Sequence, residues 1–154
     1  MGKIDWKGEL AGHFENLRVI ERCQAEAIGL FDQFCEFIAE PAFESLTEEL
    51  ALYRIKTRQQ KAKGRDIRFI ICFPGTKDEH FQYRLTLPRN AVELQLKLQV
   101  RARRSPRTDY QTSDEDFMPG RSPLEVLKME KDDVIHDIIQ HYGRFCYASL
   151  TSPE

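Results

Sequence analysis

The chain has 154 residues, of which 41% are hydrophobic and 31% are charged, and its formal net charge is -2 at pH 7. A chain of this length buries enough surface to fold without a metal or disulfides, so residues 1–154 are predicted to form a single domain. No apolar run approaches the roughly 20 residues that cross a bilayer, so no membrane segment is expected.

The small net charge hides an uneven distribution along the chain. Residues 1–50 carry four Lys/Arg against eleven Asp/Glu (net -7), residues 51–104 fourteen against four (net +10), and residues 105–154 five against ten (net -5). The basic middle segment is compatible with an anionic partner, or with acidic helices packed beside a basic sheet in one fold.

The cysteines and the N-terminus indicate a cytoplasmic location. MGKIDWKGELAG lacks the apolar segment of a secretion signal. The cysteines are far apart and mostly lie beside apolar residues, which suits buried free thiols in a reducing compartment. They are Cys23, Cys35, Cys72 and Cys146.

The first predicted helix covers residues 16–40. Its apolar residues recur at intervals of three and four, as on one face of a helix: Leu17, Ile20, Ala27, Ile28, Phe31, Phe34, Cys35 and Ile38. Pro41 is expected to end this helix, because the residue before a proline disfavours α geometry, and to begin another. Residues 1–13 are predicted to be mobile.

The second predicted helix covers residues 42–62, although ALYRIKTR within it also alternates as a strand would. The choice rests on charge. Glutamates lie at the start of the segment and Arg58, Lys61 and Lys63 at its end, which matches the helix dipole. Gly64 then stands where a helix C-cap is expected.

Three strands of an antiparallel meander are predicted at residues 67–73, 80–87 and 92–104. The third, VELQLKLQVRARR, alternates apolar and polar residues without a break, which is typical of a strand with one buried face. The apolar residues are expected on an inner face beneath the helices. The outer face is expected to carry Arg68, Ile70, Cys72, His80, Gln82, Arg84, Thr86, Glu93, Gln95, Lys97, Gln99, Arg101 and Arg103.

The last third of the chain contains one long loop and one helix. Residues 103–123 lack periodicity and are predicted to be a mobile loop that orders on a partner. Residues 124–129 form either a short helix or a fourth strand. In DDVIHDIIQHYGRFC, the apolar residues from Val134 to Cys146 share one helical face. The predicted fold is therefore two-layer α+β: an N-terminal helix pair and a C-terminal helix on one face of a three- or four-stranded antiparallel meander.

The outer sheet face provides the candidate binding residues. An open basic face can bind the phosphates of nucleic acid, here without aromatic side chains for stacking. The same residues also solvate a sheet and discourage edge pairing, which is the more common role of such lysines and arginines. The candidates are Arg68, Arg84, Lys97, Arg101, Arg103, Arg104 and Arg107.

A second candidate lies on the last helix, where Asp133, Asp137 and His141 are four residues apart on one stripe. Carboxylates and an imidazole at this spacing can bind a divalent metal. The stripe is expected to lie opposite the apolar face and to be solvated. No nucleophile motif, phosphate loop or dinucleotide fingerprint occurs, so neither catalytic residues nor a cofactor are predicted.

The sequence therefore favours a non-catalytic interaction module that contacts a protein partner through the sheet edge or the 103–123 loop. Binding of nucleic acid or another polyanion by the basic face is the first alternative. A metal-dependent enzyme that uses the Asp/His stripe is the second.

Overall fold

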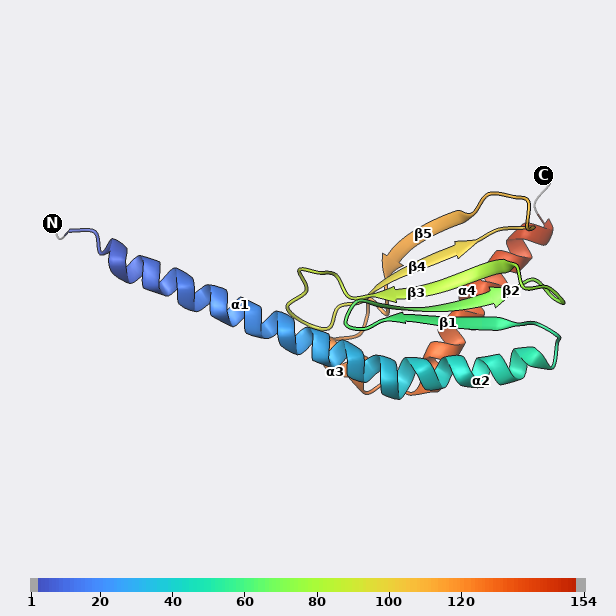
Figure 1. Ribbon diagram of the computed structural model, residues 1–154, viewed down its shortest axis with the longest axis horizontal. Coiled ribbons are helices and arrows are strands. Elements are labelled where there is room, and N and C mark those ends of the chain that lie inside the picture. Colours follow the sequence, from blue (N-terminus) through green and yellow to red (C-terminus); the bar gives the residue numbers. More distant parts are fainter. Residues whose placement is uncertain (1–2, 152–154) are drawn as a thin grey trace.

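The computed structural model describes residues 3–151, which form helices and one five-stranded antiparallel sheet (Figure 1). The strands follow one another in chain order, β1-β2-β3-β4-β5, and every neighbouring pair is antiparallel. The predicted α+β fold with a meander sheet is confirmed, with five strands in place of three or four.

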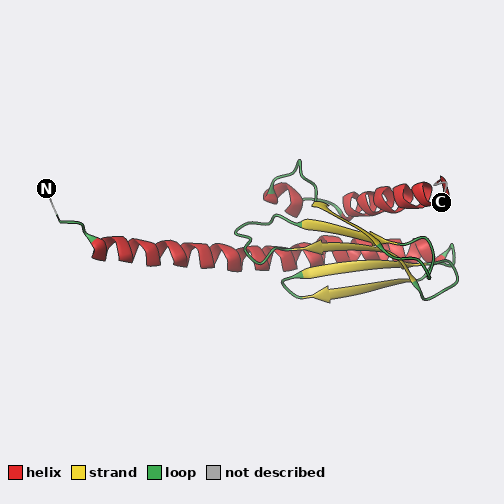
Figure 2. Ribbon diagram, turned by 90° about the horizontal axis from the view of Figure 1, so that it is seen from above, coloured by secondary structure: helices red, strands yellow, loops and turns green. Residues whose placement is uncertain are grey.

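One long helical rod occupies the N-terminal third of the chain. It consists of α1 (Trp6–Phe34), a π-helical turn (Cys35–Ala39) and α2 (Glu40–Ala51). The Asp5 side chain caps the first turn by accepting a hydrogen bond of 3.0 Å from the backbone N–H of Gly8. The rod extends well beyond the sheet at its N-terminal end (Figures 1 and 2).

Two predictions about this rod were wrong. Residues 6–15, outside the predicted helix, are helical, and Pro41 does not end the helix. The wide π turn directly precedes Pro41, whose missing N–H would otherwise interrupt the regular hydrogen-bond ladder.

The predicted helix over residues 42–62 was also wrong beyond Ala51. The chain turns at Arg54, which has a φ of 61°, and continues into strand β1 (Thr57–Ala62). Gly64, with a φ of 74°, forms the turn to β2 rather than a helix C-cap. The basic residues that suggested a helix C-terminus belong to an edge strand, where charge is equally common.

The remaining strands are β2 (Asp66–Cys72), β3 (Glu79–Thr86), β4 (Lys97–Ala102) and β5 (Gln111–Asp116). β4 is shorter than the predicted strand over residues 92–104. Residues 103–123, predicted as one loop, contain β5, an exposed and acidic edge strand.

A bulge changes the face on which one predicted residue lies. Ile71 pairs with Phe81 but Cys72 pairs with Glu79, which leaves His80 as the extra residue. His80 therefore turns toward the helices rather than the outer face. It stacks on Phe73, with ring centroids 4.3 Å apart, and meets Tyr142 and Phe145 of the last helix edge-on.

The core lies between the inner sheet face and the helices, as predicted. Strand residues such as Phe69, Phe81 and Leu98 belong to one buried cluster with Phe31 and Phe43 of the rod. Phe43 stacks on Phe69 at 5.0 Å. The other helices complete this layer: α3 (Pro123–Leu127), which resolves the ambiguity of residues 124–129, and α4 (Lys131–Thr151).

Candidate functional site

Helix α1 carries one mostly apolar stripe from end to end, interrupted by His13 and Gln24, with intervals of four and three residues that repeat every seven. Its members are Trp6, Leu10, His13, Leu17, Ile20, Gln24, Ala27, Phe31 and Phe34, and the same spacing continues to Ile38 in the π turn. A repeat of this kind is the pattern of helices that pack along their length against another helix.

The domain covers only the C-terminal part of this stripe. Ala27, Phe31, Phe34 and Ile38, which we call the covered segment, are all buried in the core between sheet and helices. The sheet, α2 and α4 all lie toward this end of the rod (Figure 1). The apolar face of α1 is therefore satisfied within the chain only from Ala27 onward.

The other part of the stripe is exposed from Trp6 to Ile20 within residues 3–151, and only Gln24 at its end is partly buried. We call its six members, Trp6, Leu10, His13, Leu17, Ile20 and Gln24, the α1 seam. The exposed fractions of its large apolar side chains are 61% for Trp6, 47% for Leu10, 52% for Leu17 and 44% for Ile20. Phe14, 54% exposed, borders the seam. A row of exposed large apolar side chains along one face of a surface helix is typical of an interaction site.

Local sequence does little to hold the seam helical without a partner. Gly12 lies in the helix between the seam residues Leu10 and His13, and a Cβ built there would meet no atom within 4 Å, so no close approach requires a glycine. Glycine in a helix interior costs about 1 kcal/mol relative to alanine. Most helical stability in proteins comes from packing of an amphipathic face, so packing of the apolar face of α1 is the expected source of stability.

The predicted basic residues on the sheet face mostly pair with acidic ones. Arg84 contacts the Asp66 carboxylate at 2.7 Å, and the Arg68 Nε lies 3.7 Å from the same carboxylate. The Arg101 guanidinium forms a bidentate ion pair with the Glu79 carboxylate, with N–O distances of 2.7 to 3.0 Å.

The acidic β5 strand neutralises more of this face, because Lys97 pairs with Asp116. The Gln99 amide also donates to the Asp114 carboxylate at 3.1 Å. The positive field expected from the sequence is therefore reduced by carboxylates that the sequence reading had placed in a loop.

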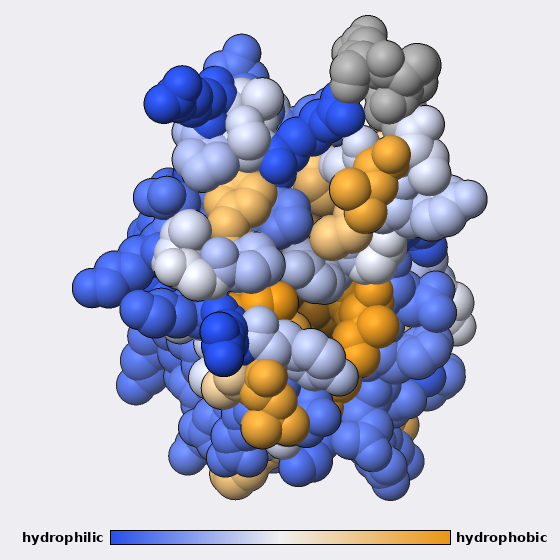
Figure 3. All heavy atoms as spheres, turned by 90° about the vertical axis from the view of Figure 1, so that its right-hand side faces the viewer, coloured by the Kyte–Doolittle hydropathy of each residue, from blue (hydrophilic) through white to orange (hydrophobic). Residues whose placement is uncertain are grey.

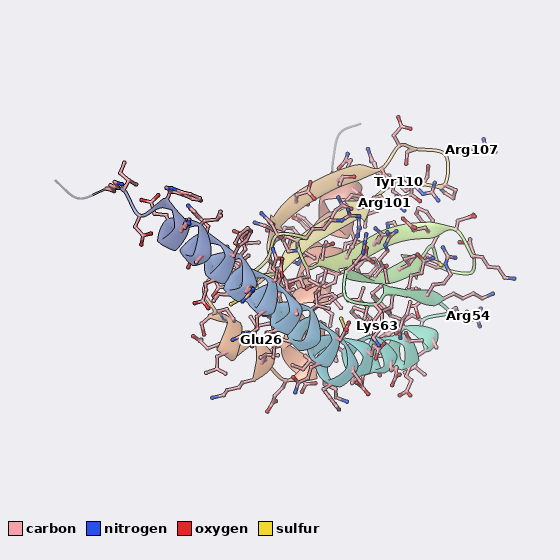
Figure 4. All side chains as sticks on the ribbon, turned by 60° about the vertical axis from the view of Figure 1, so that its left-hand side comes forward. Glu26, Arg54, Lys63, Arg101, Arg107 and Tyr110 are labelled. Carbon is pink, nitrogen blue, oxygen red and sulfur yellow. The ribbon has the colours of Figure 1, made fainter. Side chains whose placement is uncertain are left out.

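The other predicted basic residues gather at one corner of the sheet. Arg103 lies over the Tyr110 ring at 4.6 Å and Arg101 over the same ring at 4.3 Å, as cation–π contacts. Arg104 donates to the Ser149 carbonyl at 2.8 Å. Figure 4 shows Arg101, Tyr110 and Arg107 together at this corner.

The second basic cluster of the sequence, around Lys63, lies elsewhere. Residues 63–65 connect β1 to β2, whereas residues 103–110 connect β4 to β5. In an antiparallel meander these two connections are at opposite ends of the sheet, as Figure 4 shows for Lys63 and Arg107. The two clusters therefore do not form one anion site.

The Asp/His stripe of α4 was expected to be solvated, and this expectation was wrong for two of its three residues. Tyr83, fully buried on β3, donates a hydrogen bond to the Asp137 carboxylate. The His141 Nε2 lies 2.5 Å from the Glu115 carboxylate of β5, and its Nδ1 lies 2.8 Å from the Asp137 carbonyl. Asp133 lies at the start of the helix and approaches Arg121 at 3.8 Å.

These contacts join α4 to strands β3 and β5 of the sheet. Burial, and secondarily the Asp137 carboxylate, raise the pKa of Tyr83 well above its usual value, so this phenol stays protonated as a donor. Across residues 3–151, no three His, Cys, Asp or Glu side chains come together in a way that would hold a metal ion.

Burial shifts the pKa values of one histidine and one cysteine. Burial, followed by the nearby Arg103 charge, lowers the pKa of His80. Burial raises the pKa of the Cys35 thiol to about 12, which leaves almost no thiolate at neutral pH. All four cysteines are free thiols.

A hollow opens between β4, β5 and α4 at the end of the molecule away from the α1 seam. It has a volume of about 360 Å³ and is lined by Val100, Ala102 and Phe145 together with polar residues of β5, among them Glu115. Figure 3 shows apolar side chains at the bottom of a depression on this end. It is wide open to solvent, and among the described residues none of its lining side chains carries a buried polar atom that lacks a hydrogen-bond partner.

Comparisons with family models, with curated proteins and with solved structures found no match to this chain. Among the residues that the structure describes, no helix combines the length and apolar character that a bilayer crossing requires.

Sequence reasoning missed the α1 seam, although its signal is present in the sequence. The seven-residue repeat begins at Trp6, ten residues before the predicted helix start. Gly8, Gly12 and His13 weaken the local helix signal there. The lack of cover over the seam is a property of the fold, since it depends on where the sheet ends.

Proposed function

We propose that this protein is a non-catalytic interaction module that binds a protein partner through the α1 seam. The observation that carries the proposal is the change in surroundings along one stripe: the same repeat is fully buried from Ala27 onward and exposed from Trp6 to Ile20. Exposure of this strip to water costs free energy that a partner would recover.

The chemistry of the seam indicates a helical partner. Its residues alternate in steps of three and four, and such a narrow apolar seam fits the matching seam of another amphipathic helix. The sheet edges, favoured from sequence, are less suited, because the outer strands β1 and β5 are exposed and polar.

A site-specific photo-crosslinker tests the proposal in cells that express the protein. It replaces either Leu17, in the seam, or Val19, on the opposite side of the helix; the two side chains are 52% and 54% exposed. The proposal predicts adducts of discrete mass from position 17 and none from position 19. Equal crosslinking from both positions, or none from either, would contradict it.

A second candidate function, anion binding, is favoured by the corner at which Arg101 and Arg103 stack on Tyr110 beside Arg107. Proteins that bind single-stranded nucleic acids commonly combine aromatic rings, on which bases stack, with arginines that contact the phosphates. Because Arg101 also holds Glu79, the informative variant is Arg107→Glu with Tyr110→Ala. Fluorescence anisotropy with labelled single strands at physiological salt should show binding by the wild type and none by the variant.

A further inference from the structure

We propose that the partner of the α1 seam is a second copy of this chain, bound antiparallel from Trp6 to Gln24. The inference rests on the proposed function and names the occupant of the same surface. The arguments are the register of the seam, its flanking charges, its length, and a hollow at its base.

The seam is self-complementary when one helix runs against the other. In an antiparallel pair, the first and fourth positions of the seven-residue repeat meet across the seam. Leu10, Leu17 and Gln24 hold the first position, and Trp6, His13 and Ile20 the fourth. A pair centred on residue 15 sets Leu10 against Ile20, Leu17 against His13, and Gln24 against Trp6, each twice by symmetry.

The charges beside the seam agree with this register. In the same pairing, Lys7 of each copy flanks Glu21 of the other, which gives two attractive contacts. In a parallel pair, Glu9 would flank Phe14 and Asn16 would flank Glu21, so no pair of opposite charges would form. The flanking residues therefore favour the antiparallel arrangement.

The free length of the helix matches the pairing. Every residue of α1 from Trp6 to Arg22 is exposed, and Cys23 and Gln24 are the first to be partly buried by the domain. A pair centred on residue 15 uses residues 6–24, about 27 Å of helix, and ends where the domain begins. Each domain then lies beyond Trp6 of the other copy, so the two domains are at opposite ends of the helix pair.

A hollow at the base of the seam offers a place for the far end of the second copy. It has a volume of about 140 Å³. Its lining consists of Gln24 and Ile28 of α1 and of residues from the β1–β2 and β3–β4 connections: Gly64, Arg65, Leu87, Pro88, Arg89 and Ala91. The pairing sets the second copy's Trp6 opposite Gln24, beside these apolar side chains. The largest exposed ring of the seam thereby meets apolar side chains flanked by two arginines, Arg65 and Arg89, which can also contact the face of an indole ring.

Sedimentation of the full chain with two matched variants tests the dimer. The wild type is expected to sediment as a dimer, Leu17→Glu as a monomer, and Val19→Glu as a dimer, although both variants add one charge at similarly exposed positions. A carboxylate inside the seam should raise the dimer Kd by about 100-fold or more. The inference would be overturned if the wild type stayed monomeric at about 100 μM, which is roughly 100 times a micromolar Kd. It would also be overturned if the two variants sedimented alike.

A charge exchange tests the antiparallel register. Lys7→Glu should raise the dimer Kd by roughly tenfold, and addition of Glu21→Lys should restore it. Lys7 and Glu21 are about 21 Å apart along one helix, so restoration can only arise between two copies. Absence of restoration would overturn the register.

Spin labels give an independent measure of direction. In a Cys23→Ser, Cys146→Ser background, labels at Glu15→Cys have no separation along the axis of an antiparallel pair, and labels at Arg22→Cys are separated by about 21 Å along it. A parallel pair would give the same distance for both labels and would overturn the inference.

The dimer and the proposed function can fail separately. A monomeric wild type whose position 17 still crosslinks to a protein of another mass would overturn the second copy as partner and leave the proposed function standing. A monomeric wild type without crosslinks from position 17 would overturn both.

Discussion

The two ends of helix α1 present the same apolar repeat to different surroundings. From Ala27 to Phe34 the repeat packs into the domain core, and from Trp6 to Ile20 it faces solvent. Both ends contain aromatic and aliphatic residues at the repeat positions, although the α1 seam at the solvent-facing end also contains His13 and Gln24. The difference arises from the length of the sheet, and it separates residues that stabilise the fold from residues available for binding.

The largest expected effect is on the covered segment. Phe31→Ala should lower the free energy of unfolding by about 3–5 kcal/mol, since it removes a ring that is fully buried in the core. Urea denaturation in dilute solution measures this. Leu17→Ala is the control and should change the value by less than about 0.5 kcal/mol. Similar losses for both variants would remove the distinction between the two ends.

The pH dependence of stability should also reflect the covered segment. The pKa of Cys35 is about 12 in the folded chain and 9.0 when unperturbed, so its thiol stays protonated in the fold while the unfolded chain loses this proton. Stability from this group is present below pH 9 and is lost between pH 9 and 12, by roughly 2–4 kcal/mol.

The Cys35→Ala variant isolates this contribution from the tyrosines, which ionise in the same range. Denaturation measured at several pH values from 8 to 12 should show a steeper decline for the wild type than for Cys35→Ala. Parallel pH profiles would show that the thiol is not held protonated by burial in the fold.

The reaction rates of two cysteines should also differ between the exposed and the buried part of the helical rod. Cys23 is partly exposed at the base of the α1 seam, whereas Cys35 is buried at the start of the π turn. An aromatic disulfide reagent should modify Cys23 at least about 100-fold faster than Cys35, which reacts only after local opening. Peptide mapping after brief exposure identifies the modified residue, and comparable rates would indicate that the rod opens readily at Cys35.

The smallest expected effect comes from Gly12, on the uncovered part of α1. Gly12→Ala should stabilise the helix by about 1 kcal/mol, because alanine is the better helix former and nothing occupies the space. A rise in the helical circular dichroism signal of dilute protein would show this. Loss of dimer in this variant would instead place a partner directly over Gly12.

Much of the fold could be predicted from the sequence where burial is strong and regular. The alternating residues of β2, β3 and β4 and the apolar face of α4 correctly placed the core layer. Strand β1 was predicted as helix because its sequence, TRQQKA, has no apolar face that would indicate a strand. It becomes a strand by pairing with β2, which is a tertiary effect that local charge patterns cannot reveal.

The candidate site was harder to predict for a related reason. The seven-residue repeat of α1 can be read from the sequence, but the point at which the sheet stops covering it cannot. Asp137 and His141 illustrate the same limit, since their partners Tyr83 and Glu115 come from strands far away in the chain. In both cases the surroundings of a residue depend on contacts between elements that are distant in the sequence.

Hydrogen exchange as a function of protein concentration tests the central claim most directly. The account predicts that amides of residues 6–24 exchange rapidly in dilute protein and become protected as concentration rises, while amides of residues 27–38 stay protected throughout. Protection of residues 6–24 that does not change with concentration would contradict the claim that this half of α1 is completed by a second copy.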